Sequence, residues 1–274
     1  MNDMVRYAAE KWSLNDLRTI YEHSEKAVYR ADSAVFGAVI LKWDRSCAQL
    51  LSEYTMLARL NGETACKVYE FEEQNSLLLE ECILPGTVLR EEPSLEQRVR
   101  AFEKVFRAIH TPANDGETYL DWLYSVNEYC RNNPVEPELA HMTAKAHDIC
   151  KEIFSKYTNR VLLHGDLHHD NLLLRNDGTY AMIDPKGVIG PAIFDLPRYI
   201  LNEIDTAHTD PDDVHIENVI CLLSEHLGYP ADDISKLYFM ETVLANIWSC
   251  EDNEPVNRDE LALASNILSK FAQT

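Results

Sequence analysis

The spacing of apolar residues along the chain predicts strands in its first third and mostly helices after it. In the first third, short apolar runs bounded by turn residues are typical of strands. The predicted strands cover residues 26–31, 34–43, 66–71 and 76–80. Residues 1–22 and 47–60 carry apolar residues at helical spacing, so we expect helices there.

After residue 83 the apolar residues recur mostly at helical spacing. The predicted helices cover residues 94–109, 118–131, 138–157, 212–227, 232–250 and 258–272. One central stretch differs, because the apolar segments 161–163, 172–174 and 180–183 are short and predict strands. The turn signal Asn176-Asp177-Gly178 separates the last two, which predicts a hairpin. The chain as a whole is therefore expected to be an α+β protein.

Three oxygen-bearing side chains stand at the ends of these central strands. Asp166 lies in the sequence His-Gly-Asp, Asn171 precedes the second strand and Asp184 follows the third. In a hairpin, Asn171 and Asp184 come to neighbouring strand ends, and Asp166 lies on the loop just before them. Oxygen ligands of this kind hold Mg²⁺, and a further Asp accepts the proton of an attacking hydroxyl. The arrangement suits magnesium-assisted phosphoryl transfer.

The same stretch is open to two other interpretations. It contains a group of side chains of the types that bind transition metals in hydrolases: Asp166, His168, His169 and Asp170. These are also ordinary loop residues that need no chemistry. The order of strand, loop, strand, turn, strand and acidic residue, together with the H-x-D-x-x-x-x-N spacing, favours a kinase.

The motifs HGDLHHDN, IDPKGVIG and FDLPRY resemble the aminoglycoside phosphotransferase superfamily. The Asp-Pro-Lys-Gly form within them is similar to the streptomycin 6-phosphotransferase and hydroxyurea kinase family. The resemblance implies a two-lobed protein-kinase-like fold, with a small antiparallel-sheet N-lobe and a mostly helical C-lobe. It implies a nucleotide-binding lobe over residues 1–82 and a catalytic, substrate-binding lobe over 83–274. It also implies ATP as co-substrate and Mg²⁺ as cofactor.

The resemblance assigns roles to residues of the first lobe. Lys42, at the end of a predicted strand, would hold the ATP phosphates, and Glu53 on the following helix would orient it. Residues 23–27 take the place of the phosphate-covering loop, where Ser24 would contact a phosphate although no G-x-G-x-x-G is present. A lysine at a strand end is also a common device against aggregation.

The remaining roles follow from the hinge and the central stretch. By position, the Glu80 carbonyl and the Cys82 amide would hydrogen-bond adenine. Asp166 would be the catalytic base, and Asn171 with Asp184 would hold Mg²⁺.

Composition narrows the class of protein. The 274 residues have a net charge of −21, which disfavours nucleic acid as a partner. The longest apolar run is too short to span a bilayer, and no signal peptide is recognisable, so we expect no membrane association. Seven cysteines without a C-x-x-C pair indicate a reduced, cytoplasmic protein. The sequence carries no indication of its oligomeric state.

The acceptor is expected to be a small molecule. Gly165 replaces the Arg that regulated protein kinases carry, and only ten residues separate Asp184 from Asp195, which leaves no room for a peptide-docking segment. Residues 203–260 hold fifteen acidic residues against two basic ones, which favours a cationic acceptor. An aminoglycoside of the streptomycin type is the first expectation. The alternatives are a kinase of choline, a hydroxy-amino acid or a sugar, and a non-catalytic nucleotide-binding regulator.

Overall fold

The computed structural model describes residues 3–60 and 62–272. Within it the chain forms two compact units. Unit 1 comprises the residues up to Leu89 together with Asn171–Gly187, and unit 2 comprises Arg90–Asp170 and the residues from Val188 onward. The central stretch is thus shared, because its hairpin belongs to unit 1 and its His-Gly-Asp loop to unit 2. The functional boundary expected after Cys82 stays a prediction.

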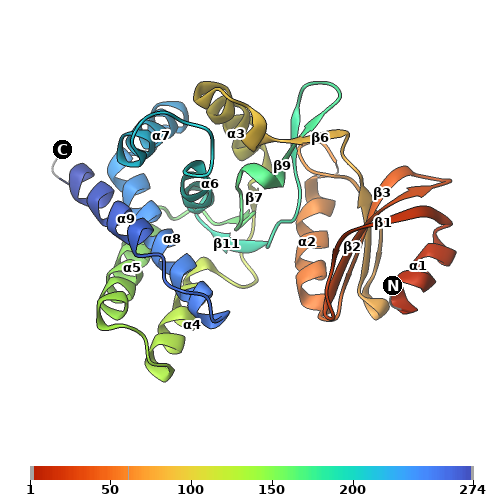
Figure 1. Ribbon diagram of the computed structural model, residues 1–274, viewed down its shortest axis with the longest axis horizontal. Coiled ribbons are helices and arrows are strands. Elements are labelled where there is room, and N and C mark those ends of the chain that lie inside the picture. Colours follow the sequence, from red (N-terminus) through yellow and green to blue (C-terminus); the bar gives the residue numbers. More distant parts are fainter. Residues whose placement is uncertain (1–2, 61, 273–274) are drawn as a thin grey trace. The chain divides into compact units, whose positions relative to one another are not determined.

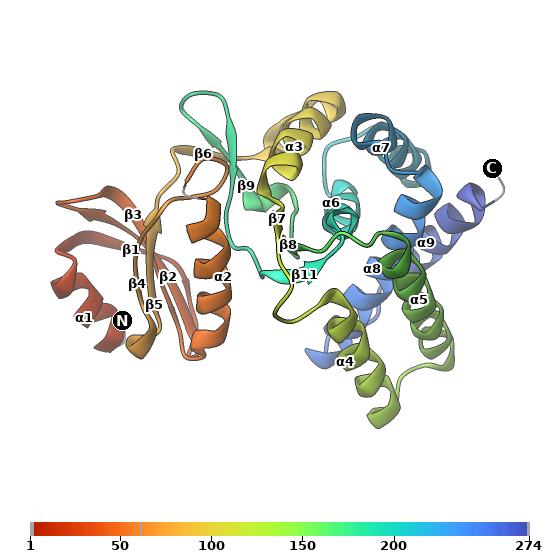
Figure 2. The ribbon, with the colours of Figure 1, turned by 180° about the vertical axis from the view of Figure 1, so that it is seen from behind.

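Unit 1 is built on an antiparallel five-stranded sheet of order β1-β2-β3-β5-β4. Its strands are β1 (Leu14–Glu22), β2 (Lys26–Ser33), β3 (Gly37–Asp44), β4 (Val68–Glu72) and β5 (Leu77–Glu81). Helix α1 (Asp3–Lys11) lies on one face and α2 (Cys47–Leu60) on the other (Figures 1 and 2). Inward-facing residues of α1 and the sheet, such as Val5, Tyr29 and Leu41, form one apolar core.

The predicted helix over residues 1–22 is wrong beyond Lys11, and residues 1–2 of that prediction lie outside the described residues. Ser13 adopts a left-handed backbone conformation (φ 53°) that ends the helix, and the following residues pair with β2 as strand β1. Strand β1 lies at the sheet edge, so Ile20 and Tyr21 remain 61% and 52% exposed. Because its apolar residues do not alternate between a buried and an exposed face, the pattern did not indicate a strand.

A second small sheet of unit 1 carries the predicted central hairpin. Strands β9 (Leu172–Arg175) and β10 (Tyr180–Met182) pair antiparallel, and β6 (Pro85–Val88) joins β9. The Ile183 amide extends the pairing by donating to the Asn171 carbonyl over 3.0 Å. The hairpin prediction is therefore confirmed, and Asn171 and Asp184 flank its open end.

Unit 2 is mostly helical. Its helices are α3 (Leu95–Ile109), α4 (Tyr119–Asn132), α5 (Pro137–Lys156), α6 (Leu196–Glu203), α7 (Asp212–Leu227), α8 (Ala231–Glu251) and α9 (Arg258–Phe271). A small sheet joins β7 (Thr111–Pro112), β8 (Val161–Leu163) and β11 (Val188–Gly190). Helix α8 is buried along most of its length, against α5, α6 and α9. The six predicted helices of this region are confirmed to within two residues at each end.

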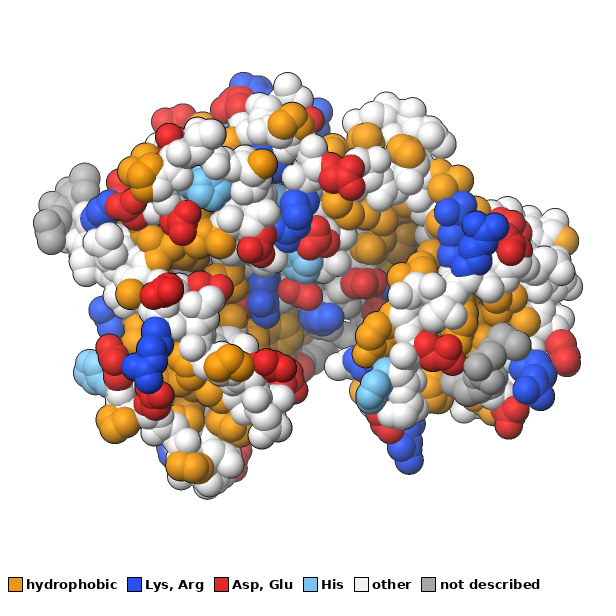
Figure 3. Space-filling model, viewed as in Figure 1, with side chains coloured by type: hydrophobic (Ala, Val, Ile, Leu, Met, Phe, Trp, Pro, Cys, Tyr) orange, Lys and Arg blue, Asp and Glu red, His pale blue; other side chains and the backbone are white. Residues whose placement is uncertain are grey.

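The predicted fold class is confirmed, since an antiparallel-sheet N-terminal part is followed by a mostly helical part. On the face drawn in Figure 3, acidic and basic side chains are interspersed over apolar ones. Among the described residues, no helix combines the length and the apolar content that crossing a membrane requires.

Candidate functional site

Lys42 is the centre of a buried ionic cluster in unit 1. Its side chain leaves β3 toward the interior and is 7% exposed. The Lys42 Nζ lies 2.5 Å from Glu53 Oε1 on α2 and 2.8 Å from Glu80 Oε1 on β5. The same ammonium group also pairs with Asp184, which follows β10. The structure thus brings the predicted Lys42, Glu53 and Asp184 together.

The cluster holds three carboxylates and one ammonium group, and this imbalance sets its electrostatics. Burial alone lowers the pKa of Lys42, but the surrounding carboxylates, Glu53 foremost, raise that pKa well above its ordinary value. Burial also raises the pKa of Glu53, and Glu80 adds to the rise while Lys42 opposes it. The surplus of negative charge makes the cluster receptive to a further cation.

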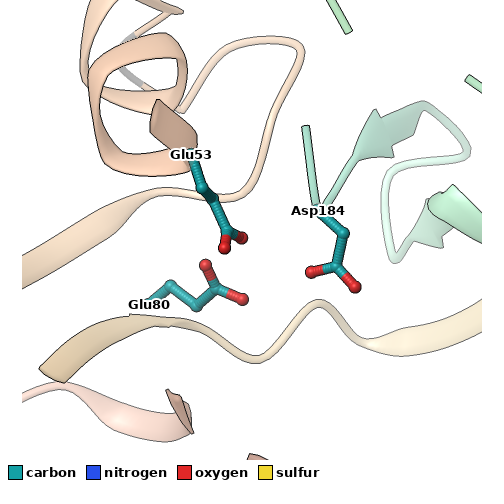
Figure 4. A group of neighbouring side chains, drawn as sticks. All are labelled: Glu53, Glu80 and Asp184. Carbon is teal, nitrogen blue, oxygen red and sulfur yellow. The ribbon is translucent and has the colours of Figure 1, made fainter. Parts of the chain in front are cut away.

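Figure 4 shows the three carboxylates of this cluster pointing toward one another from α2, β5 and the segment after β10. One ligand oxygen from each of Glu53, Glu80 and Asp184 lies within 4.8 Å of the others. Carboxylate oxygens, with the Asn171 amide oxygen at the start of the same hairpin, are the hard donors that Mg²⁺ accepts. The donor chemistry therefore fits this ion.

The backbone around Asp184 turns sharply. Asp184 has φ 57°, a left-handed conformation that is uncommon for a residue other than glycine. Gly187 follows with φ 71°, and a Cβ there would lie 2.5 Å from the Ser52 hydroxyl of α2. That hydroxyl donates to the Lys186 carbonyl over 2.6 Å. The positive φ and the close approach to α2 each favour glycine at this turn.

In unit 2, Asp195 fixes the loop that carries Asp166. Its carboxylate accepts from the amides of His164 and Gly165 over 2.9 and 2.7 Å. It is also hydrogen-bonded to His110 Nε2 over 2.9 Å. The amide of Asp166 donates in turn to His164 Nδ1 over 3.2 Å. Asp195 therefore ties the loop to the start of α6, although its side chain does not cap this described helix end.

The residues after Asp166 are held by different partners in unit 2. Asp170 accepts two bonds from the Arg90 guanidinium at 2.8 Å each. His169 is fully buried and is hydrogen-bonded to Glu203 over 2.9 Å. His168 lies 3.8 Å from one carboxylate oxygen of Asp166 and 3.8 Å from one of Asp170. Because Arg90 occupies Asp170 and Glu203 occupies His169, these side chains do not form a set of metal ligands among the described residues, which argues against the metal-hydrolase interpretation.

Two further predicted nucleotide contacts lie in unit 1. Ser24 is exposed in the turn between β1 and β2, with its hydroxyl 3.3 Å from His23 Nδ1. The Cys82 amide donates to the Ala38 carbonyl over 3.2 Å, so contact with adenine requires this bond to be exchanged. Glu80 was predicted for its carbonyl alone, and the structure adds its side chain to the Lys42 cluster.

Sequence reasoning missed the role of the Glu80 side chain and, in unit 2, of the partly buried Arg198 and the buried Glu203 and Glu241. Arg198 and Glu241 lie beside Asp166, and Glu203 lies beneath its loop. Glu241 is 1% exposed and paired with Arg198, so its carboxylate is not presented to a ligand. The one signal in the sequence was the position of Arg198 within the FDLPRY motif.

The fold is that of protein-kinase-like phosphotransferases. The structure of aminoglycoside phosphotransferase APH(4)-Ia, solved as a thermostable mutant in ternary complex with ADP and hygromycin B, is similar with a TM-score of 0.70 and 15% identity over 98% of this chain and 97% of that chain. Choline kinase LicA from Streptococcus pneumoniae gives 0.70 and 14% over 100% of both chains. A choline/ethanolamine kinase family protein from Mesorhizobium loti gives 0.66 and 15% over 98% and 94%.

The family model described as aminoglycoside/hydroxyurea antibiotic resistance kinase matches residues 11–253. The chain therefore belongs to this family and is a small-molecule phosphotransferase. A search of curated proteins found no match. The family resemblance seen in the sequence motifs is confirmed.

Proposed function

We propose that this protein transfers the γ-phosphoryl group of ATP to a hydroxyl of a small molecule, with a streptomycin-like aminoglycoside as the preferred acceptor. The observation that carries the proposal is the buried Lys42, held by Glu53 and Asp184 within unit 1. A lysine fixed by a helical glutamate, next to an acidic residue that follows a hairpin, is the set of groups that kinases use to bind Mg·ATP.

Each residue has one task in the proposed reaction. Lys42, oriented by Glu53, binds the ATP phosphates. Ser24 in the β1–β2 turn contacts a phosphate, and the Glu80 carbonyl and Cys82 amide contact adenine. These assignments are supported by the family membership and by the positions of the residues in unit 1.

Asn171 and Asp184 are proposed as the protein ligands of Mg²⁺. Their oxygen donors and the negative surplus around Asp184 fit this ion. When bound, Mg²⁺ supplies neutralisation of charge on the transferred phosphoryl group.

Asp166 is proposed as the base that orients the acceptor hydroxyl and accepts its proton. Its loop is braced by the Asp195 carboxylate and by His164, so the carboxylate is presented from a fixed backbone. Orientation and fixed charges, rather than covalent chemistry, then provide most of the acceleration.

The test is ATP consumption by the purified protein with Mg²⁺ against aminoglycosides, hydroxyurea, choline and small sugars. Turnover of one acceptor, with a product heavier by one phosphoryl group in mass spectrometry, supports the proposal. Asp166→Asn should lower kcat by about 10²–10⁴-fold, the usual contribution of a general base. Calorimetry should find Mg·ATP affinity unchanged in that variant. Full activity of Asp166→Asn would remove this residue from the mechanism.

Choline or a related amino alcohol is the second candidate acceptor. It is favoured by the structural similarity to choline kinases. If the protein selectively phosphorylates choline, choline replaces the aminoglycoside as the proposed acceptor. ATP binding without turnover of any acceptor would favour a non-catalytic nucleotide-binding role. A cytoplasmic location is proposed as well, supported by the seven cysteines, all of which are free in the described structure.

A further inference from the structure

Arg198 occupies an unusual place in unit 2, between two carboxylates. It lies on α6, two residues after the start of this helix, and its side chain is 22% exposed. The Arg198 Nε lies 2.9 Å from Glu241 Oε1 on α8 and 3.4 Å from Asp166 Oδ1 on the loop after β8. One guanidinium group therefore joins the proposed base to a helix that is otherwise part of the core.

The far side of Arg198 is fixed by further groups. Glu241 is 1% exposed, and its second oxygen accepts a hydrogen bond from the Tyr119 hydroxyl of α4. The Arg198 guanidinium also lies over the Trp248 ring, 5.2 Å from the ring centroid. An arginine held by a carboxylate, an aromatic face and neighbouring packing loses most of its rotational freedom. Its guanidinium is thereby preorganised for Asp166.

The electrostatics agree with this geometry. Burial raises the pKa of Glu241 and Arg198 opposes that rise, while burial raises the pKa of Tyr119 with Glu241 adding to it. The positive charge of Arg198 is thus balanced by two carboxylates. A purely structural pair of Arg198 and Glu241 would not need the approach to Asp166.

We propose that Arg198 is a positioning residue for Asp166, and that Glu241 and Tyr119 hold Arg198 in place. The inference rests on the proposed function, because it assigns to Arg198 the orientation of the base in that reaction. Arg198 draws the Asp166 carboxylate into one orientation and leaves its proton-accepting role intact. Loss of this orientation lowers the rate of transfer without lowering the affinity for Mg·ATP, whose proposed ligands belong to unit 1.

The test compares steady-state kinetics of Arg198→Gln, Glu241→Gln, Arg198→Lys and Arg198→Gln/Glu241→Gln with the wild type, using the acceptor that the ATP-consumption assay identifies. We expect kcat to fall about 10²-fold in Arg198→Gln, the loss typical of a small misplacement of a catalytic group. Arg198→Lys keeps the positive charge but lacks the planar guanidinium group. Its kcat should therefore be about tenfold higher than that of Arg198→Gln and still below the wild-type value. The KM for ATP should stay within about twofold.

The double variant keeps the proposal testable if Arg198→Gln folds poorly. It removes both charges together, so no unpaired carboxylate stays buried. Because the two residues are proposed to act as one unit, its kcat should fall about 10²-fold below the wild-type value, the loss expected for Arg198→Gln alone, with no added loss from Glu241→Gln. The matched control is Arg258→Gln on α9, an arginine paired with Glu136 at the surface, which should keep the wild-type kcat.

Three outcomes overturn the inference. Wild-type kcat in folded Arg198→Gln would show that Asp166 needs no such partner. Additive losses in the double variant, or a rise in the KM for ATP in place of a fall in kcat, would make the pair merely structural. These failures are separate from failure of the proposed function, which full activity of Asp166→Asn would signal.

Discussion

Substitution of Arg98 by methionine should destabilise unit 2 strongly. Arg98 on α3 is 1% exposed and donates to both oxygens of Glu203 on α6, over 3.0 and 2.8 Å. Glu203 itself is 0% exposed and is also hydrogen-bonded to His169 and His215 over 2.9 and 3.1 Å. The network therefore surrounds one buried carboxylate with several donors.

The magnitude follows from what the substitution leaves behind. Removal of one partner of a buried ion pair costs about 3–5 kcal/mol, because the other charge stays buried. Met fills much of the vacated volume, and the two histidines still donate to Glu203, so we expect about 3 kcal/mol. Burial raises the pKa of Glu203, but hydrogen bonds from His169, His215 and Arg98 outweigh burial and hold that pKa below its ordinary value.

The assay is urea unfolding followed by circular dichroism, with each transition fitted separately if the two units unfold apart. Arg100→Met is the matched control, since Arg100 lies on the same helix and pairs with Glu96 at the surface. That substitution should change the midpoint little. If Arg98→Met shifts the midpoint no more than Arg100→Met does, the buried network does not stabilise unit 2 as argued.

Three further predictions test other parts of the structure. Gly187→Ala should lower the free energy of unfolding in urea more than Gly228→Ala does. Both glycines have positive φ, but only a Cβ at Gly187 would meet a neighbour, the Ser52 hydroxyl. Equal losses of about 1–2 kcal/mol in the two variants would contradict this. Asp195→Asn should lower the free energy of unfolding by about 1–3 kcal/mol and also lower kcat, because the asparagine side chain cannot accept hydrogen bonds from all the donors that Asp195 binds. An unchanged kcat would show that Asp195 does not contribute to catalysis. Burial lowers the pKa of His169 below its ordinary 6.5, so the stability that depends on its neutral form is fully present above about pH 6.5 and is lost as the pH falls through the lowered pKa. A urea midpoint that does not fall between about pH 7 and 5 would refute this.

The sequence predicted most of the elements and the identity of the central hairpin, since these follow from local patterns. Helical periodicity is strong in unit 2, where one face of each helix is buried. The failure at Leu14–Glu22 has a physical cause, because an edge strand with exposed apolar residues lacks the alternation that marks a strand.

The site was predictable only where chemistry follows motif spacing. Asp166, Asn171 and Asp184 stand at fixed distances from strands that the sequence itself indicates. Lys42 and Glu53 needed the family resemblance, and the structure joins them through an ion pair of 2.5 Å. The spacing of these residues in the sequence predicts their positions because each lies directly before or after a strand that the local pattern also predicts.

The remaining partners were hidden because they depend on long-range packing. Glu80 meets Lys42 only once β3 and β5 pair, with Ile40 opposite Glu80 in the register. Arg198 and Glu241 lie on separate helices, 43 positions apart in the printed sequence. Neither pairing leaves a trace in periodicity or composition.

The acidic late segment shows the same distinction between composition and structure. Three of its carboxylates, on Glu203, Asp233 and Glu241, are at most 1% exposed and pair with Arg98, Lys156 and Arg198. Their charges stabilise internal pairs and are not presented to a ligand. Attraction of the proposed cationic acceptor would therefore have to come from exposed residues such as Asp205 and those around Glu251. The excess of acidic residues in the sequence overstates the field that an incoming substrate meets, because part of it is neutralised inside unit 2.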